Sequence, residues 1–229
     1  IERITIDSLS VANTLDDLQS TGVATSALVV TGDKKLTITA ALDAEILSVD
    51  ASANTGGLVL TNSPTFANAT ITGSAAADTI DAPTGVTAIT GGAGNDFVTF
   101  DGTLTAKDTF DGGDGVDTVK INGGNLTQTS VVGGLSNVEI LELSTAHTIS
   151  LESNISPTTF DFGTNETNQV LNLLDGYTAA TTVKLGSDAT NEDKIVNTAN
   201  VDLTITANST SYDETTSVTG GTGTDSILS

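Results

Sequence analysis

The strongest constraint on the fold of this chain is a nine-residue pattern, Gly-Gly-x-Gly-x-Asp-x-U-x, in which U is a large aliphatic residue. Two complete copies occupy residues 91–99 and 112–120, with Asp96 and Asp117 at the acidic position. Glycine permits the positive φ angles of a tight turn whose carbonyl groups face a common centre. The aspartate adds a charged oxygen, and the aliphatic residue begins a short strand. The pattern therefore predicts tight turns that alternate with short strands.

Further copies of the pattern flank these two. Residues 220–228 form another complete copy, with Asp225, and residues 73–81 keep the first glycine and Asp78. Two more distant copies carry Asn168 in place of the aspartate and two extra residues before Asp193. We interpret these last two as structural turns.

The intervals between the acidic positions indicate that successive coils stack. Asp78 and Asp96 are 18 residues apart, and Asp96 and Asp117 are 21 apart. Stacked coils repeat at the strand spacing of about 4.8 Å, so we expect these three carboxylates to line one edge. Later intervals of 51, 25 and 32 residues, which lead to Asn168, Asp193 and Asp225, are irregular. They predict a solenoid with loops.

Composition and periodicity favour the same fold. Aromatic residues make up only 3% of the chain and tryptophan is absent, which suits a narrow solenoid filled by aliphatic side chains. From residue 28 onward, short alternating runs such as Leu36-Thr37-Ile38 stand between turns rich in Gly, Asn and Asp. Residues 1–27 are less regular, and residues 13–18 favour a short capped helix. We therefore expect an irregular entry segment at 1–27 and an all-β solenoid at 28–229.

The charge of the chain excludes several classes of partner. With 29 acidic and 7 basic residues, the formal net charge is −22, which repels nucleic acid and anionic membrane surfaces. No apolar run is long enough for a membrane span, and the absence of cysteine excludes disulfides and thiolate metal sites. Many of the aspartates lie at turns, which favours bound cations over a purely solubilising role. The chain begins without Met and stops after a repeat turn, so we expect a fragment of a longer protein.

The nonapeptide resembles the calcium-binding repeat of RTX proteins, which build parallel β-helices. The resemblance implies a parallel β-helix or β-roll-like solenoid stabilised by Ca²⁺. Calcium takes six to eight oxygen ligands, and in this family they come from two adjacent turns, as carboxylates and loop carbonyls. Carried over to this chain, the implied metal ligands are Asp78, Asp96, Asp117 and Asp225, with Asp114 as an extra carboxylate and the turn residues Gly91, Ala93 and Gly112.

Three other stretches resemble the large bacterial surface-layer (S-layer) proteins exported by type I secretion. They are GGLSNVEILELS at 133–144, VVTGDKKLTI at 29–38 and ITGSAAADTI at 71–80. This resemblance implies an extracellular structural segment at the bacterial cell surface, which binds calcium and self-assembles into a lattice. Its partners would be copies of itself, and cell-surface polysaccharide through regions outside this chain. The alternatives are the stalk of an RTX adhesin and a secreted β-helical carbohydrate-active enzyme.

An enzyme has little support in the residues. The only arginine is Arg3, the six lysines are scattered, and no spacing singles out a pair of acids as in a glycosidase. The only histidine, His147, shares a face with Ile149 and Leu151, which indicates a partly buried imidazole outside any site. We therefore predict a protein that is not an enzyme and has no catalytic residues.

Overall fold

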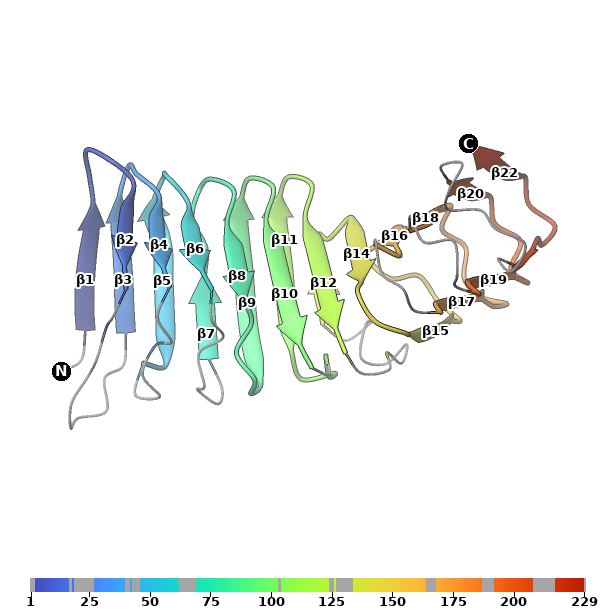
Figure 1. Ribbon diagram of the computed structural model, residues 1–229, viewed down its shortest axis with the longest axis horizontal. Coiled ribbons are helices and arrows are strands. Elements are labelled where there is room, and N and C mark those ends of the chain that lie inside the picture. Colours follow the sequence, from blue (N-terminus) through green and yellow to red (C-terminus); the bar gives the residue numbers. More distant parts are fainter. Residues whose placement is uncertain are drawn as a thin grey trace.

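The protein is an all-β solenoid whose coils stack along one axis (Figure 1). The structure is a computed structural model that describes residues 3–16, 18, 27–39, 42, 46–61, 69–102, 104–123, 126, 134–163, 168–186, 192–207 and 217–228. Within these ranges every regular element is a strand, and the strands pair in parallel. The predicted fold class, a parallel β-solenoid, is confirmed.

The described strands form three sheets, of which one runs through all the coils. This long sheet contains β2 (Asn13–Leu15), β4 (Leu36–Ile38), β6 (Leu58–Leu60), β8 (Thr79–Asp81), β10 (Phe97–Asp101), β12 (Thr118–Asn122), β14 (Ile140–Leu143), β16 (Thr159–Asp161), β18 (Thr181–Lys184), β20 (Leu203–Thr206) and β22 (Asp225–Leu228). Each strand bonds to the next even-numbered strand, so the chain makes one coil between them.

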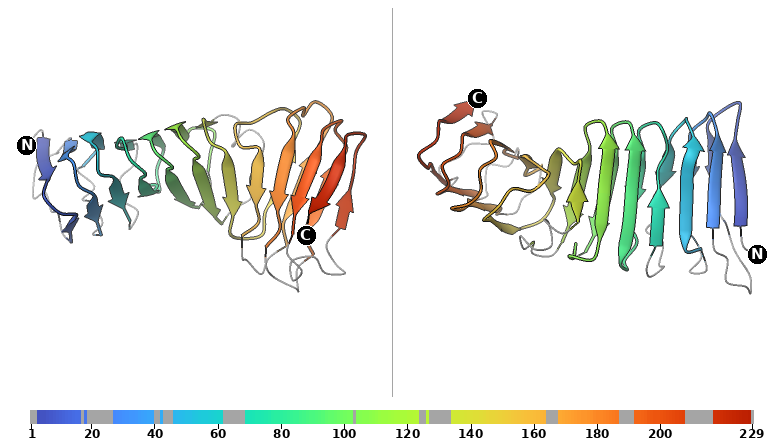
Figure 2. Two further views of the ribbon diagram at one scale, coloured as in Figure 1. Left: turned by 90° about the horizontal axis from the view of Figure 1, so that it is seen from above. Right: turned by 180° about the vertical axis from the view of Figure 1, so that it is seen from behind.

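Two shorter sheets share the opposite side of the coils. The N-terminal sheet contains β1 (Arg3–Ser8), β3 (Ala27–Gly32), β5 (Ser48–Asn54), β7 (Ala69–Thr72), β9 (Thr87–Ala93), β11 (Thr109–Asp114) and β13 (Leu135–Ser136). The C-terminal sheet contains β15 (Thr148–Leu151), β17 (Val170–Leu173), β19 (Lys194–Asn197) and β21 (Ser217–Thr219). The coils after β14 are turned relative to the straight stack that precedes them (Figures 1 and 2).

The core is a column of aliphatic side chains in register from coil to coil. Strands alternate buried and half-buried residues with period two, as in β4, where Leu36 and Ile38 are buried and Thr37 is half-buried. One inward position of the long sheet is occupied in successive strands by Ile38, Leu60, Ile80, Val98, Val119, Leu141, Phe160, Val183 and Ile205, all buried. The aliphatic position of the nonapeptide, Val98 and Val119, therefore belongs to the core, as predicted.

The predicted helix at residues 13–18 is wrong where the structure describes it. Asn13, Thr14 and Leu15 form β2, which pairs in register with β4. The Asn13 N–H donates to the Lys35 carbonyl at 2.9 Å, and the Asn13 side chain donates to Ser8 Oγ at 2.9 Å. A single helical turn is unstable by itself in water, whereas a strand at this position gains hydrogen bonds and a buried face from the next coil. The pairing therefore overrides the local capping signal.

We predict that the core column carries most of the stability of the stack. Leu141→Ala removes a fully buried side chain, and we expect a loss of about 2–5 kcal/mol in the free energy of unfolding. Leu228→Ala is the matched control, because Leu228 is 55% exposed, and should change the free energy by at most about 0.5 kcal/mol. Urea unfolding followed by circular dichroism measures both, and similar losses would contradict this account of the core.

Candidate functional site

Acidic side chains form a file along the solenoid at the position just before the strands of the long sheet. One oxygen of each side chain accepts the main-chain N–H of the equivalent residue in the preceding coil. The four hydrogen bonds run from Leu58 N to Asp78 Oδ1 (2.6 Å), Asp78 N to Asp96 Oδ1 (2.8 Å), Asp96 N to Asp117 Oδ1 (2.7 Å) and Asp117 N to Glu139 Oε2 (2.7 Å). We call this file the carboxylate ladder. The predicted stacking of Asp78, Asp96 and Asp117 on one edge is confirmed.

The glycines of the nonapeptide make room for this ladder. A Cβ atom at Gly91 would lie 2.2 Å from Asp96 Oδ2 and 2.5 Å from the carbonyl oxygen of Gly112. The second glycine of that turn, Gly92, has a φ of 115°, which side chains rarely adopt. The first glycine of the other copies is crowded by its own aspartate in the same way, at Gly73, Gly112 and Gly220. The glycine and the aspartate of the pattern are therefore required together.

The aspartates of the ladder are shielded from water. Asp78, Asp96 and Asp117 are 2%, 1% and 0% exposed. Burial raises the pKa of Asp78 and of Asp117, and it raises the pKa of Asp96 to about 7, with the neighbouring carboxylates of Asp78 and Asp117 adding to the effect. The main-chain N–H donors oppose these shifts, because a hydrogen bond to a carboxylate favours its charged form.

Two oxygen atoms of the ladder are buried without a hydrogen-bond partner. They are Asp96 Oδ2 and Asp117 Oδ2, on adjacent coils. A buried carboxylate that lacks a compensating partner is costly, so these atoms favour a bound proton or cation. Adjacent coils are about 4.8 Å apart. A calcium ion that contacts one oxygen on each coil spans about 4.6–5.2 Å, twice its usual distance of 2.3–2.6 Å to oxygen. The spacing of the coils that carry these two carboxylates matches this span, and their charge suits a divalent cation.

The other ligands of such an ion would not be acidic side chains. Within the described residues no three His, Cys, Asp or Glu side chains gather closely enough to hold a metal. The Gly112 carbonyl borders the space beside Gly91 that a Cβ would fill, next to Asp96 Oδ2. Main-chain carbonyls and water would therefore complete the six to eight oxygens that calcium requires.

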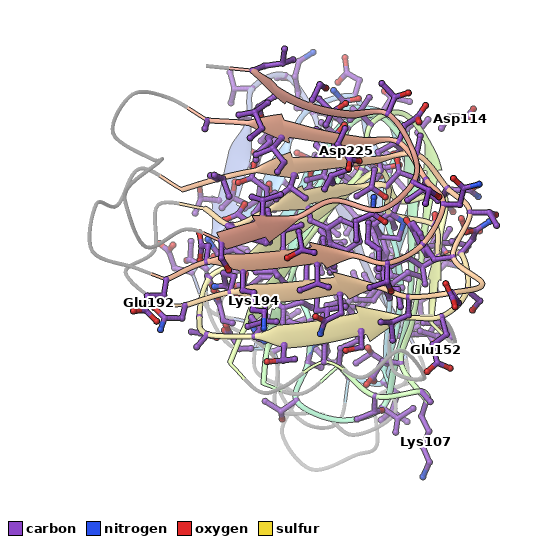
Figure 3. The ribbon with its side chains drawn as sticks, turned by 90° about the vertical axis from the view of Figure 1, so that its right-hand side faces the viewer. Lys107, Asp114, Glu152, Glu192, Lys194 and Asp225 are labelled. Carbon is purple, nitrogen blue, oxygen red and sulfur yellow. The ribbon has the colours of Figure 1, made fainter. Side chains whose placement is uncertain are left out.

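The remaining predicted ligands lie outside the buried ladder. Asp114 is exposed at the rim of the solenoid, on the side opposite Glu192 (Figure 3), and its main-chain carbonyl accepts the Gly94 N–H at 2.8 Å. Ala93 pairs with Asp114 in register on the neighbouring strand. Asp225 is equivalent in register to the ladder positions but lies in β22, where it is exposed, and it accepts a 3.3 Å hydrogen bond from Asn197 Nδ2. The structure therefore gathers Asp78, Asp96 and Asp117, but leaves Asp225 apart.

The residues that continue this hydrogen-bonding pattern beyond the glycine-rich motifs were not identified from the sequence. Glu139 ends the carboxylate ladder, and a second file stands before the strands of the C-terminal sheet. There the His147 N–H donates to Gln169 Oε1 at 3.0 Å, and the Gln169 N–H donates to Asp193 Oδ1 at 2.9 Å. Asp193 is thus a structural residue, as predicted, whereas Gln169 occupies the position assigned to Asn168. Glu139 and Gln169 each have a side-chain oxygen and stand directly before a predicted strand, and that signal could have identified them.

His147 is buried more completely than the partly buried imidazole that we predicted, and Tyr177 is also in the core. His147 is 2% exposed, and its Nε2 lies 3.0 Å from Thr145 Oγ1. Tyr177 is 1% exposed, and its hydroxyl oxygen accepts a hydrogen bond from Thr181 Oγ1 at 3.1 Å. Both side chains therefore pack inside the stack.

A cleft of about 380 Å³ lies at the other end of β8 and β10 from the ladder, between the segments that follow these strands. Its lining residues are Pro83, Thr84, Gly85, Val86, Phe100, Asp101, Gly102, Thr105 and Asp108. Asp108 accepts the N–H groups of Thr87 and Thr105, both at 2.9 Å, and Asp101 accepts Asn122 Nδ2 at 2.7 Å. Hydrogen bonds within the solenoid thus hold both carboxylates of the cleft.

No protein-family model, curated protein or solved structure significantly matches this chain. Of the described residues, none forms a helix long and apolar enough to cross a membrane. The fold and the ladder geometry are therefore the basis of the functional argument.

The raised pKa of Asp96 predicts how stability depends on pH when calcium is removed. The folded protein holds a proton on Asp96 up to about pH 7, whereas the unfolded chain releases it near pH 4. Because the folded state binds more protons in this range, the free energy of unfolding should fall by up to about 4 kcal/mol as pH rises from 4 to above 7. Urea unfolding in chelator at a series of pH values measures this slope.

Asp96→Asn tests the origin of that slope. Asparagine keeps an oxygen that accepts the Asp78 N–H but no longer titrates, so the slope should become shallower. Asp33→Asn is the control, because Asp33 is exposed and its hydrogen bond with Lys34 lowers its pKa. A variant slope equal to that of the unaltered chain would exclude Asp96 as the titrating group.

Proposed function

We propose that this chain is a structural segment of a secreted bacterial cell-surface layer, in which calcium bound at the carboxylate ladder stabilises a stacked solenoid. The observation that carries the proposal is the pair of buried, orphaned oxygens on Asp96 and Asp117. They repeat at the spacing of the coils, inside a chain whose formal charge is −22. A cation at this place relieves both the local and the global repulsion.

The architecture supports a structural role. Each strand bonds only to the equivalent strands of the adjacent coils, and the long sheet continues without interruption from β2 to β22. Solenoids of this kind gain stability by adding coils, and they present long, regular surfaces. The side chains of the carboxylate ladder, and of the second file that contains Gln169 and Asp193, accept main-chain N–H groups of the preceding coil. Their chemistry holds coils together.

Calcium would couple folding to location. An ion that binds only the folded ladder adds its binding free energy to that of folding. Inside a cell free calcium is scarce, so the acidic chain would remain loose enough for export through a type I system. Outside, at millimolar calcium, the coils would stack. This behaviour suits an extracellular protein that assembles with copies of itself at the cell surface.

The stalk of an RTX adhesin is the second candidate, because the same rigid stack would serve as a spacer. Calcium-dependent sheets or two-dimensional crystals of the purified protein favour the surface layer, whereas binding to a defined glycan or receptor favours the adhesin. Turnover of a polysaccharide panel would instead favour a β-helical enzyme, for which the hydrogen-bonded carboxylates of the cleft offer little support.

We predict that calcium raises the stability of this chain strongly. Between excess chelator and millimolar Ca²⁺ at pH 7.5, β-sheet circular dichroism and the melting temperature should both increase, because the ion replaces the missing partners of Asp96 and Asp117. Mg²⁺ should substitute poorly, since it requires a tighter octahedral shell at about 2.1 Å. Equal melting temperatures in chelator and in calcium would refute the proposal.

Matched variants locate the effect. Asp96→Asn and Asp117→Asn should lose most of the calcium-induced increase in melting temperature and most of the heat of calcium binding. Asp33→Asn and Asp50→Asn should keep both, because Asp33 contacts Lys34 and Asp50 contacts Ser52, away from the ladder. If all four variants lose calcium binding equally, the ladder is not the site.

A further inference from the structure

The outer face of the long sheet carries a file of residues without any charge. These residues follow the positions of the carboxylate ladder and are aligned strand by strand. In order they are Thr14, Thr37, Val59, Thr79, Phe97, Thr118, Ile140, Thr159, Thr182, Thr204 and Ser226. All are exposed or half-buried. We call them the outer file.

In the straight part of the stack the outer file alternates between small and bulky side chains. From β4 to β14 the sequence of residues is Thr37, Val59, Thr79, Phe97, Thr118, Ile140. The bulky residues therefore stand on every second strand, about 9.6 Å apart, with a threonine hollow between them. This is a ridged surface with a fixed period.

The charges beside the outer file are largely balanced. In the next outward file of the same face, Lys120 lies 2.6 Å from Glu142, and Lys184 lies 3.6 Å from Asp161. Asp81 also belongs to this neighbouring file. The chain as a whole has a net charge of −22, so most of its surface would repel a second copy. This face combines an uncharged file with paired charges, and two copies could meet along it with little repulsion.

We propose that the outer file is a self-association surface on which a second copy of the chain packs its own outer file. This inference rests on the proposed structural function and specifies one contact through which copies would assemble. A two-fold axis between β8 and β10 sets Phe97 against Thr79 of the second copy, Val59 against its Thr118, and Ile140 against its Thr37. Every bulky residue then meets a threonine hollow. The two sheets pack face to face about 10 Å apart, as in a β-sandwich.

The size of the contact defines its strength. The contact spans six strands and two outward files, which is roughly 30 Å by 14 Å. It would bury about 400 Å² on each copy, half of the ~800 Å² that each partner buries in a stable complex. A single pair therefore dissociates readily, and the contact becomes stable when it is repeated in an array. Sedimentation velocity over a concentration series that extends to high protein concentration is the appropriate measurement.

The first test compares two variants with the same change of charge at fixed millimolar calcium. Thr118→Glu adds a negative charge to the outer file and should weaken self-association at least tenfold. Thr90→Glu adds the same charge to the exposed face of β9, in the N-terminal sheet, and should associate like the unaltered chain. Circular dichroism and melting temperature verify that both variants fold. Equal association by both variants, or an unaltered chain that stays monomeric at every concentration, overturns the proposal.

The second test uses the absence of cysteine from the chain. A mixture of Phe97→Cys and Thr79→Cys should form disulfide-linked dimers faster than Thr90→Cys alone, although Thr90 is the more exposed position. If Thr90→Cys cross-links faster than the mixture, the rate of disulfide formation depends on exposure alone and the proposed contact is contradicted. The calcium dependence of the melting temperature is measured separately, so failure of this contact and failure of the calcium proposal are distinguishable.

Discussion

The structure depends on one requirement, the satisfaction of main-chain N–H groups where the chain enters each strand of the long sheet. At this corner the donor points to the next coil. From β6 to β12 a side chain of that coil accepts it, as Asp117 does for Asp96, whereas at β2 and β4 a main-chain carbonyl does. A buried N–H without a partner costs about 1–3 kcal/mol, so a stack of such corners needs an acceptor in every coil. The glycine that precedes each aspartate follows from the same requirement, because the carboxylate occupies the space of its Cβ. The nonapeptide is therefore a folding motif even before any metal is considered.

The same geometry creates an electrostatic problem. One carboxylate oxygen serves the neighbouring coil, while the second oxygen of Asp96 and of Asp117 remains buried without a partner. The glutamine at position 169 performs the same structural task without a charge, and its amide also donates to the Thr145 carbonyl. An amide would thus satisfy the backbone alone. The use of aspartate in the central coils therefore supports the proposal that the ladder binds a cation.

The sequence alone allowed the fold and the centre of the site to be predicted, because both have short-range signatures. Period-two aliphatic residues mark the strands, and the interval from Asp78 to Asp117 marks the stacked coils. Residues 13–15 were mispredicted as helix because β2 is stabilised by its pairing with β4, and such long-range pairing leaves no local pattern. Glu139 and Gln169 were missed for a related reason. They accept the same N–H groups without the glycines that made the motif recognisable.

The pairing of each strand only with its counterparts one coil away determines how the segment would respond to force. A pull on the two ends of the chain loads the outermost coil first, because no strand bonds to a more distant coil. The solenoid would then lengthen in steps, and a coil of the 21 residues from Asp96 to Asp117 would release up to about 70 Å of extended chain. Once unfolding reaches the coils between Leu58 and Glu139, each step must also break one rung of the ladder. A bound cation at that rung would raise the force of a step while leaving its length unchanged, so the ionic environment would set the stiffness of the segment.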